Sequence, residues 1–165
     1  MIRSGAKREV IMHGRLTLAT TLCTAFLLLP RILPAESGRF EKTVPFPRGT
    51  EAALDWTHQK CTVRSVQVRN YPDRDDIQKA RTKDHDDKSW LWWEFHLDNR
   101  GSSECKVRLW VEVLDARGDV LKASDRSGTV DAGKIDDSIR VSTRMRTIDI
   151  ADSPRVRVRA EIVPK

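Results

Sequence analysis

From Cys61 onward, apolar residues recur at every second position, which is the period of a β-strand with one buried face. The pattern is strongest over residues 89–98, where every odd position is apolar and the even positions are mixed. The odd positions hold Leu91, Trp93, Phe95 and Leu97. No segment shows a 3.6-residue period over three turns, so the sequence favours an all-β fold.

Further strands are predicted over 104–115 and 155–163, with shorter ones near 120–121 and 138–143. Residues 61–70 also alternate, but the apolar parity changes between Val63 and Val66, which a β-bulge explains. Residues 51–56 fit either a strand or a short helical turn. Six or seven short strands, with turn residues about every ten positions, predict an antiparallel β-sandwich.

Part of this pattern resembles a known class of domain. An apolar strand ending in FHLDN is followed by a turn, then by VRLWVEVLDARGDVL, and then by DAGK before another strand. Over residues 88–163 the chain therefore resembles bacterial exported immunoglobulin-like domains of the FxLYD and fibronectin type III kind. The resemblance implies an immunoglobulin- or fibronectin-III-like sandwich, and it carries no functional residue across.

Residues 1–35 are predicted to be a signal peptide, because a basic start precedes an apolar run that ends at Pro30, Pro34 and Ala35. The run is too short to span a membrane. An uncleaved N-terminal anchor is the alternative, and Met12 is an alternative start. We expect a periplasmic or secreted protein. Residues 36–60 then form an N-terminal extension or a first strand, and residues 61–165 form the sandwich domain, with a charged insert at 70–88.

Removal of this segment changes the charge of the protein. The whole chain has 30 bases and 24 acids, for a net charge of +6. Residues 1–35 contain five bases and one acid, so 25 bases and 23 acids remain and the net charge falls to +2. Nucleic-acid binding needs a concentrated basic surface, and the sequence does not favour it.

Two cysteines, Cys61 and Cys105, remain after the predicted cleavage. An even pair in an exported chain predicts one disulfide. The alternative is two small buried side chains that never meet.

Tryptophan positions suggest a binding surface. If residues 89–98 and 104–115 form a hairpin that pairs Leu97 with Cys105, Trp92 lies opposite Trp110 on the outward face. Two adjacent indole rings form a flat platform for a sugar ring, a peptide or another subunit. Alternatively, the N-terminal segment or a second sheet covers this face.

Arginines give a second candidate site. Arg155, Arg157 and Arg159 take the outward positions of the last predicted strand, and we call them the arginine ladder. Residues 138–165 contain seven bases against three acids, whereas residues 36–137 contain 18 against 20. The ladder suits an envelope polyanion or an acidic partner. Protection of an exposed sheet edge is the alternative.

The insert offers a third, weaker candidate. Asp84, Asp86 and Asp87 have the oxygen ligands that Ca²⁺ and Mg²⁺ prefer. Their spacing is not that of an EF-hand loop, the glycine that such a loop needs is absent, and lysines and arginines nearly neutralise the insert. A solvated loop is the alternative, and no metal or other cofactor is predicted. Catalytic motifs such as G-x-S-x-G and H-E-x-x-H are absent from the sequence.

These observations together predict an exported, non-catalytic binding module that recognises an envelope protein or a polysaccharide, or associates with itself. The alternative is a structural or accessory subunit of an envelope assembly. A metal-dependent hydrolase is a remote third hypothesis.

Overall fold

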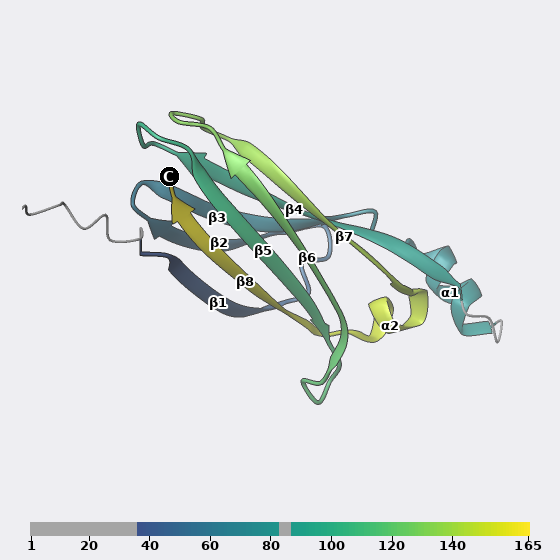
Figure 1. Ribbon diagram of the computed structural model, residues 1–165. Coiled ribbons are helices and arrows are strands. Elements are labelled where there is room, and N and C mark those ends of the chain that lie inside the picture. Colours follow the sequence, from purple (N-terminus) through teal and green to yellow (C-terminus); the bar gives the residue numbers. More distant parts are fainter. Residues whose placement is uncertain (1–35, 83–86) are drawn as a thin grey trace, which may run out of the picture. The chain divides into compact units, whose positions relative to one another are not determined.

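The computed structural model describes residues 36–82 and 87–165, which form two antiparallel four-stranded sheets packed face to face (Figure 1). Sheet A has the strand order β1-β8-β5-β6, and sheet B has the order β2-β3-β4-β7. The strands of sheet A are β1 (Gly38–Pro45), β5 (Cys105–Leu114), β6 (Val120–Val130) and β8 (Arg155–Pro164). Those of sheet B are β2 (Glu51–His58), β3 (Cys61–Arg69), β4 (Lys88–Asn99) and β7 (Asp137–Arg146). The predicted all-β sandwich is confirmed.

Alternating apolar side chains of both sheets meet between the layers and form one core. On β4, Leu91, Trp93, Phe95 and Leu97 are completely buried, as the period-2 pattern predicts. The side chains that face them from β5 and β8 are Val107, Leu109, Val111, Val113, Val156, Val158, Ala160 and Ile162. Burial of each Val, Leu, Ile or Phe contributes about 1.5–3 kcal/mol, so this interior is the main stabilising contribution.

The predicted bulge in β3 is confirmed. Val63 pairs with Leu97 and Ser65 with His96, so the register between β3 and β4 shifts by one residue. The shift lets both Val63 and Val66 point into the core, where they are completely buried. Residues 51–56 belong to a strand, β2, and not to a helical turn.

The chain crosses from sheet B to sheet A between β4 and β5, so the predicted hairpin is wrong. β4 pairs with β3 and β7, whereas β5 pairs with β6 and β8. Strand pairs such as Leu97 with Cys105, or Trp92 with Trp110, are therefore not formed. Alternation predicts which side chains point inward, but two strands that face each other across a sandwich satisfy it as well as two hairpin neighbours.

A buried asparagine holds this crossing in place. The Asn99 side-chain nitrogen donates to the backbone carbonyls of Ser103, Val130 and Asp131, at 2.8, 3.1 and 3.1 Å. Its carbonyl oxygen accepts from the backbone N–H of Gly101 at 3.0 Å. Asn99 is 1% exposed, so these protein groups satisfy the amide where bulk water has almost no access.

The predicted disulfide is confirmed and lies at the same corner. Cys61 on β3 is bonded to Cys105 on β5, so the bridge joins the two sheets. Cys61 also pairs with Asn99 across β3 and β4. The cysteines are 44 positions apart, and closing a loop of that size stabilises the fold by about 3–4 kcal/mol on the chain-entropy model.

The N-terminal part of the domain and the insert both contain more structure than the sequence predicts. Residues 36–60 supply β1 to sheet A and β2 to sheet B. The insert contains a helix, α1 (Arg74–Thr82), and Asp73 caps it by accepting from the Asp76 backbone N–H at 2.8 Å. A second helix, α2 (Thr147–Asp152), contacts α1 through the Arg81–Asp152 ion pair at 2.7 Å.

The predicted signal peptide, residues 1–35, lies outside the described residues. Within 36–82 and 87–165, no helix has the length and apolar character needed to cross a membrane. The narrower resemblance to immunoglobulin-like and fibronectin type III domains stays a prediction.

The corner predicts a large effect of Asn99→Asp on stability. The carboxylate has nearly the shape of the amide but donates no hydrogen bond, and it would face three carbonyl oxygens. We expect the free energy of unfolding, measured in urea, to fall by about 2–4 kcal/mol. Asn70→Asp makes the same chemical change at an exposed position and should cost less than about 0.5 kcal/mol. Equal losses in the two variants would contradict the role of Asn99.

Candidate functional site

The arginine ladder lies in the middle of sheet A, on its outer face. Arg155, Arg157 and Arg159 point outward from β8, between the buried Val156 and Val158 of the inward set. β8 lies between β1 and β5 and is not an edge strand. Protection of an exposed edge is therefore the wrong explanation for these arginines.

Trp110 lies beside the ladder, also on the outer face of sheet A. It pairs with Arg159 on β8 and with Asp125 on β6. The centroid of its ring is 4.8 Å from the guanidinium carbon of Arg108 and 6.0 Å from that of Arg159. Cation–π contacts of this kind contribute about 0.5–1 kcal/mol each at exposed sites. The guanidinium groups of both arginines thus lie close to the half-buried ring.

Carboxylates form salt bridges with most of the basic side chains on this face. Glu112 accepts hydrogen bonds from both Arg157 and Arg159, and Asp125 accepts from Arg108 at 2.9 Å. These groups lie on the adjacent strands β5, β6 and β8, so each ion pair also fixes the register between neighbours. The guanidinium groups are thereby held in place on the outer face.

Basic residues nevertheless outnumber acidic ones on the outer face of sheet A. Lys106 is exposed and forms no salt bridge with any residue in 36–82 or 87–165. Six bases stand against four acids, so the face has a net charge of +2. The outward charged residues are Arg39, Lys106, Arg108, Arg155, Arg157 and Arg159, with Glu41, Glu112, Asp125 and Glu161.

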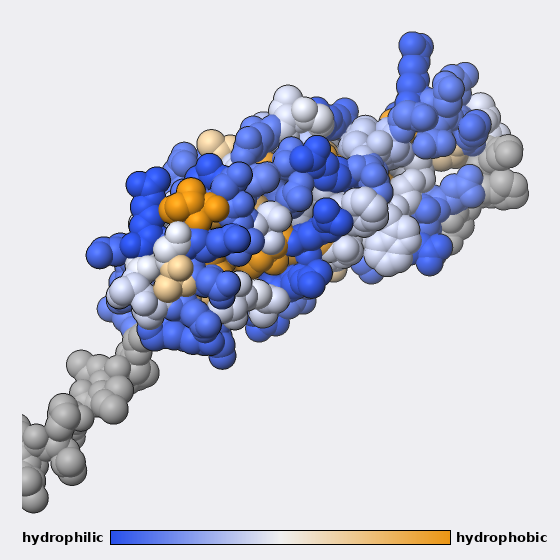
Figure 2. All heavy atoms as spheres, turned by 90° about the horizontal axis from the view of Figure 1, so that it is seen from above, coloured by the Kyte–Doolittle hydropathy of each residue, from blue (hydrophilic) through white to orange (hydrophobic). Residues whose placement is uncertain are grey.

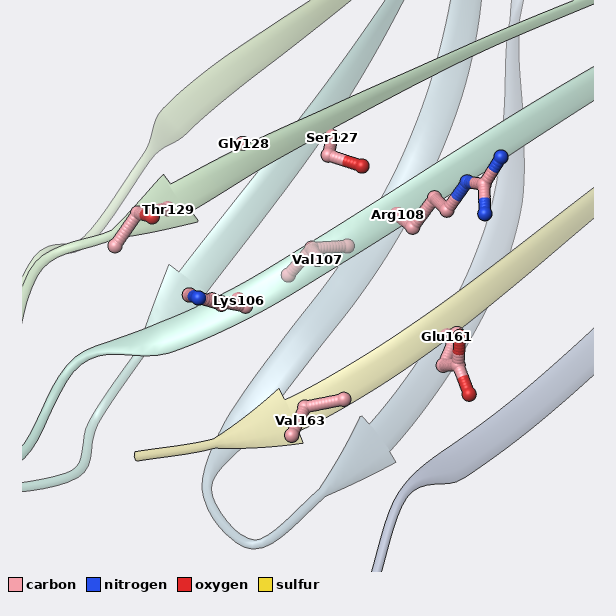
Figure 3. A pocket seen from close by; sticks show the side chains of 8 residues that line it. All are labelled: Lys106, Val107, Arg108, Ser127, Gly128, Thr129, Glu161 and Val163. Carbon is pink, nitrogen blue, oxygen red and sulfur yellow. The ribbon is translucent and has the colours of Figure 1, made fainter.

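Two adjoining hollows open on this face. One, of about 490 Å³, is lined by residues of β1, β5 and β8, including Trp110. The other, of about 400 Å³, lies over β8, β5 and β6, where Lys106, Ser127 and Thr129 contribute to its wall (Figure 3). Arg108 and Glu161 line both hollows, so the two adjoin, and we refer to them together as the depression. Each has the size of a small-ligand site.

The second predicted tryptophan, Trp92, lies on the outer face of sheet B. Its neighbour on this face is Trp90, two positions earlier on β4. The guanidinium carbon of Arg140 is 4.9 Å from the Trp92 ring centroid, and that of Arg144 is 5.8 Å from the Trp90 centroid. Trp90 is 51% exposed. Apolar residues appear only in small separate areas on the side of the molecule shown in Figure 2.

The predicted platform of Trp92 and Trp110 is wrong as a single surface. The two rings project from different sheets and point away from the core in opposite directions. The structure instead gives two separate surfaces, with Trp110 on one and Trp90 and Trp92 on the other.

Glu94 lies among the arginines of sheet B. It accepts a hydrogen bond from Arg69 at 3.0 Å, and Arg140 approaches its other oxygen at 3.8 Å. The hydrogen bond from Arg69, supported by the charges of Arg69, His96 and Arg140, lowers the pKa of Glu94 below its ordinary value of 4.5 against the opposing effect of burial. Glu94 is therefore ionised at neutral pH and partly neutralises this face.

The acidic insert gives no further support to a cation site. Asp84 and Asp86 lie outside the described residues, and Asp87 accepts from the Thr147 backbone N–H through its own backbone carbonyl. In the part of the chain that the structure describes, no three His, Cys, Asp or Glu side chains come together in a group that could hold a metal ion.

Sequence reasoning missed Trp90, Lys106 and Arg108 as members of candidate sites. All three occupy outward positions of strands that the alternation predicts, so the signal was present. The missing information was the pairing of β4 with β7 and of β5 with β8, which joins residues 40–59 positions apart. No protein-family model matches the chain, and no curated protein matches it.

Glu94→Gln should destabilise the protein in a pH-dependent way. Because the folded pKa is lowered, the ionised carboxylate stabilises the native state above pH 4.5, and this contribution is lost as the pH falls through the folded pKa. We expect the wild type to be more stable than the variant at pH 7 and the difference to vanish in acid. Urea-unfolding midpoints across this pH range measure it. Glu36→Gln, outside the strands, is the control, and a difference independent of pH would contradict the role of Glu94.

Proposed function

We propose that the protein is an exported, non-catalytic binding module that recognises an acidic polysaccharide of the cell envelope through the outer face of sheet A. The observation that carries the proposal is Trp110, a half-buried ring that lines an open hollow and contacts the guanidinium groups of Arg108 and Arg159. An indole ring offers a sugar a large flat surface with few rotatable bonds. Guanidinium groups offer paired donors to carboxylate or sulfate groups.

Each part of the depression has a role in this proposal. Acid groups of the ligand bind Arg108 and Arg159, either through donors that remain free or by replacing the internal partners of these arginines. Lys106 adds a further positive charge beyond Arg108. Ser127 and Glu161 supply a hydroxyl and a carboxylate that can hydrogen-bond to sugar hydroxyls.

The shape of the face favours a linear sugar polymer over an envelope protein as the ligand. The two hollows adjoin and together extend across all four strands of sheet A, so successive sugar units can occupy them in turn. The core of a protein–protein interface is more apolar than this face. The large apolar side chains exposed in the described residues line neither hollow; they are Trp90, Val120, Leu121 and Ile135.

Two observations support the export of the protein. The Cys61–Cys105 disulfide supports export because disulfides form and persist mainly in oxidising compartments. Residues 1–35 have the basic start and short apolar run of a signal peptide. A periplasmic or secreted location would give the module access to envelope polymers.

Calorimetric titration with hexagalacturonate tests the proposed ligand class, and its fully methyl-esterified form is the uncharged control. We expect the wild type to bind the acid form and not the ester. Lys106→Glu should weaken binding about tenfold, which is about 1.4 kcal/mol. Lys122→Glu makes the same charge change outside both hollows and should weaken binding less than about threefold.

Trp110→Ala should also weaken binding about tenfold while the circular dichroism spectrum stays that of a β-sandwich. Equal affinity for the ester, or equal losses in the two lysine variants, would refute the proposed site. Absence of any saccharide binding, with co-purification of a protein at fixed stoichiometry, would favour the accessory-subunit alternative.

The intact mass of protein made in a secreting bacterial host tests export. We expect a chain that begins near Glu36 and has two thiols that react with an alkylating agent only after reduction. A full-length mass with both thiols free would contradict export.

A further inference from the structure

The outer face of sheet B carries a second array of tryptophan and arginine, which we call the tryptophan–arginine face. It consists of Trp90 and Trp92 on β4 with Arg140 and Arg144 on β7. Arg144 lies directly opposite Trp90 in the pairing of these strands, and Arg140 lies diagonally from Trp92. The contacts between rings and guanidinium groups are of the same kind as those at Trp110.

The charge of this face also matches an acidic ligand. Arg69 and Arg140 share the single carboxylate of Glu94, at 3.0 and 3.8 Å. Within the described ranges, no carboxylate forms a salt bridge with Arg144, so its charge is not neutralised by an ion pair. Three bases against one acid give a local charge of +2. Trp90, which is 51% exposed, leaves ring surface accessible beside these cations.

The tryptophan–arginine face and the depression on sheet A point in opposite directions. Leu91 and Trp93 of β4 fill the core from one side, and Leu109 and Val111 of β5 fill it from the other. Trp90 and Trp92 therefore project from one outer face, whereas Trp110 projects from the other. Both packed sheets lie between the two outer faces, so a ligand bound flat on one face does not contact the other.

We propose that the domain binds two strands of acidic polysaccharide at once, one on each outer face, and so cross-links them. This inference rests on the proposed function and extends it. The occupant of both faces is the same class of polymer, because both offer indole rings contacted by guanidinium groups and an excess of positive charge. A cross-linker would gain strength from multivalency, since polymer held on one face raises the effective concentration of a neighbouring strand at the other.

The number of binding sites tests the inference. Calorimetric titration uses hexagalacturonate with the wild type, with a sheet A variant (Lys106→Glu with Trp110→Ala) and with a sheet B variant (Arg144→Glu with Trp90→Ala). We expect two sites per chain in the wild type and one in each variant. Thermal unfolding of each variant establishes that it is folded, and Arg144→Gln alone is the milder replacement if the sheet B variant is not.

The remaining outcomes show whether cross-linking alone fails or the proposed function fails as well. One site in the wild type that only the sheet A variant removes would overturn cross-linking and leave the proposed function intact. One site that only the sheet B variant removes would overturn both cross-linking and the assignment of the ligand to sheet A. Absence of binding in the wild type would overturn the proposed function and this inference together.

Light scattering with long polygalacturonate tests cross-linking directly. A protein with two sites should raise the scattering to a maximum near equivalence and lower it again in excess protein, whereas either variant should leave the polymer unlinked. Arg117→Gln, which removes an exposed arginine of the turn after β5, should scatter like the wild type. Equal scattering by the wild type and the two variants would overturn the inference.

Discussion

The fold depends on the crossing of the chain from sheet B to sheet A between Asn99 and Cys105. Five residues make the passage, and their extended reach of about 17 Å exceeds the roughly 10 Å between packed sheets. Three interactions converge there: the pairing of Cys61 with Asn99, the hydrogen bonds of the buried amide, and the disulfide to Cys105. Loss of the amide donors would leave backbone carbonyls unsatisfied, so this corner stabilises one topology and disfavours the hairpin.

Along one lateral side of the sandwich, polar contacts bring the sheets together. The indole N–H of Trp93 donates to Thr143 at 3.0 Å, and the Thr143 hydroxyl donates to Ser124 on β6 at 3.0 Å. β6 can approach β7 this closely because Gly128 has no side chain; a Cβ there would lie 2.7 Å from the terminal methyl group of Ile139. Along the edge formed by β6 and β7, the close approach of the two strands and these hydrogen bonds cover the core, rather than a row of large apolar side chains.

The sequence predicted the parts of this fold that depend on local periodicity. The inward residues of β4, β5 and β8, the bulge in β3 and the disulfide all follow from patterns within one strand or from the count of cysteines. The sequence does not predict which strands pair, because the alternation of Leu91 and Trp93 is the same whether β5 lies beside β4 or across the core. Helix α1 was missed because it spans only nine residues and buries only Ala80, which leaves almost no apolar period to detect.

For the candidate site, the sequence predicts the types of residue but not their arrangement, again because alternation does not determine which strands pair. Trp92 and Trp110 are outward in either topology, and in a hairpin they would lie side by side on one flat platform. The crossing at Asn99 places their strands in different sheets, so the two rings are separated by the thickness of the core. Each ring then acquires its own arginines from a strand distant in sequence, β8 for Trp110 and β7 for Trp92. A connection of five residues therefore decides whether the chain presents one aromatic surface or two.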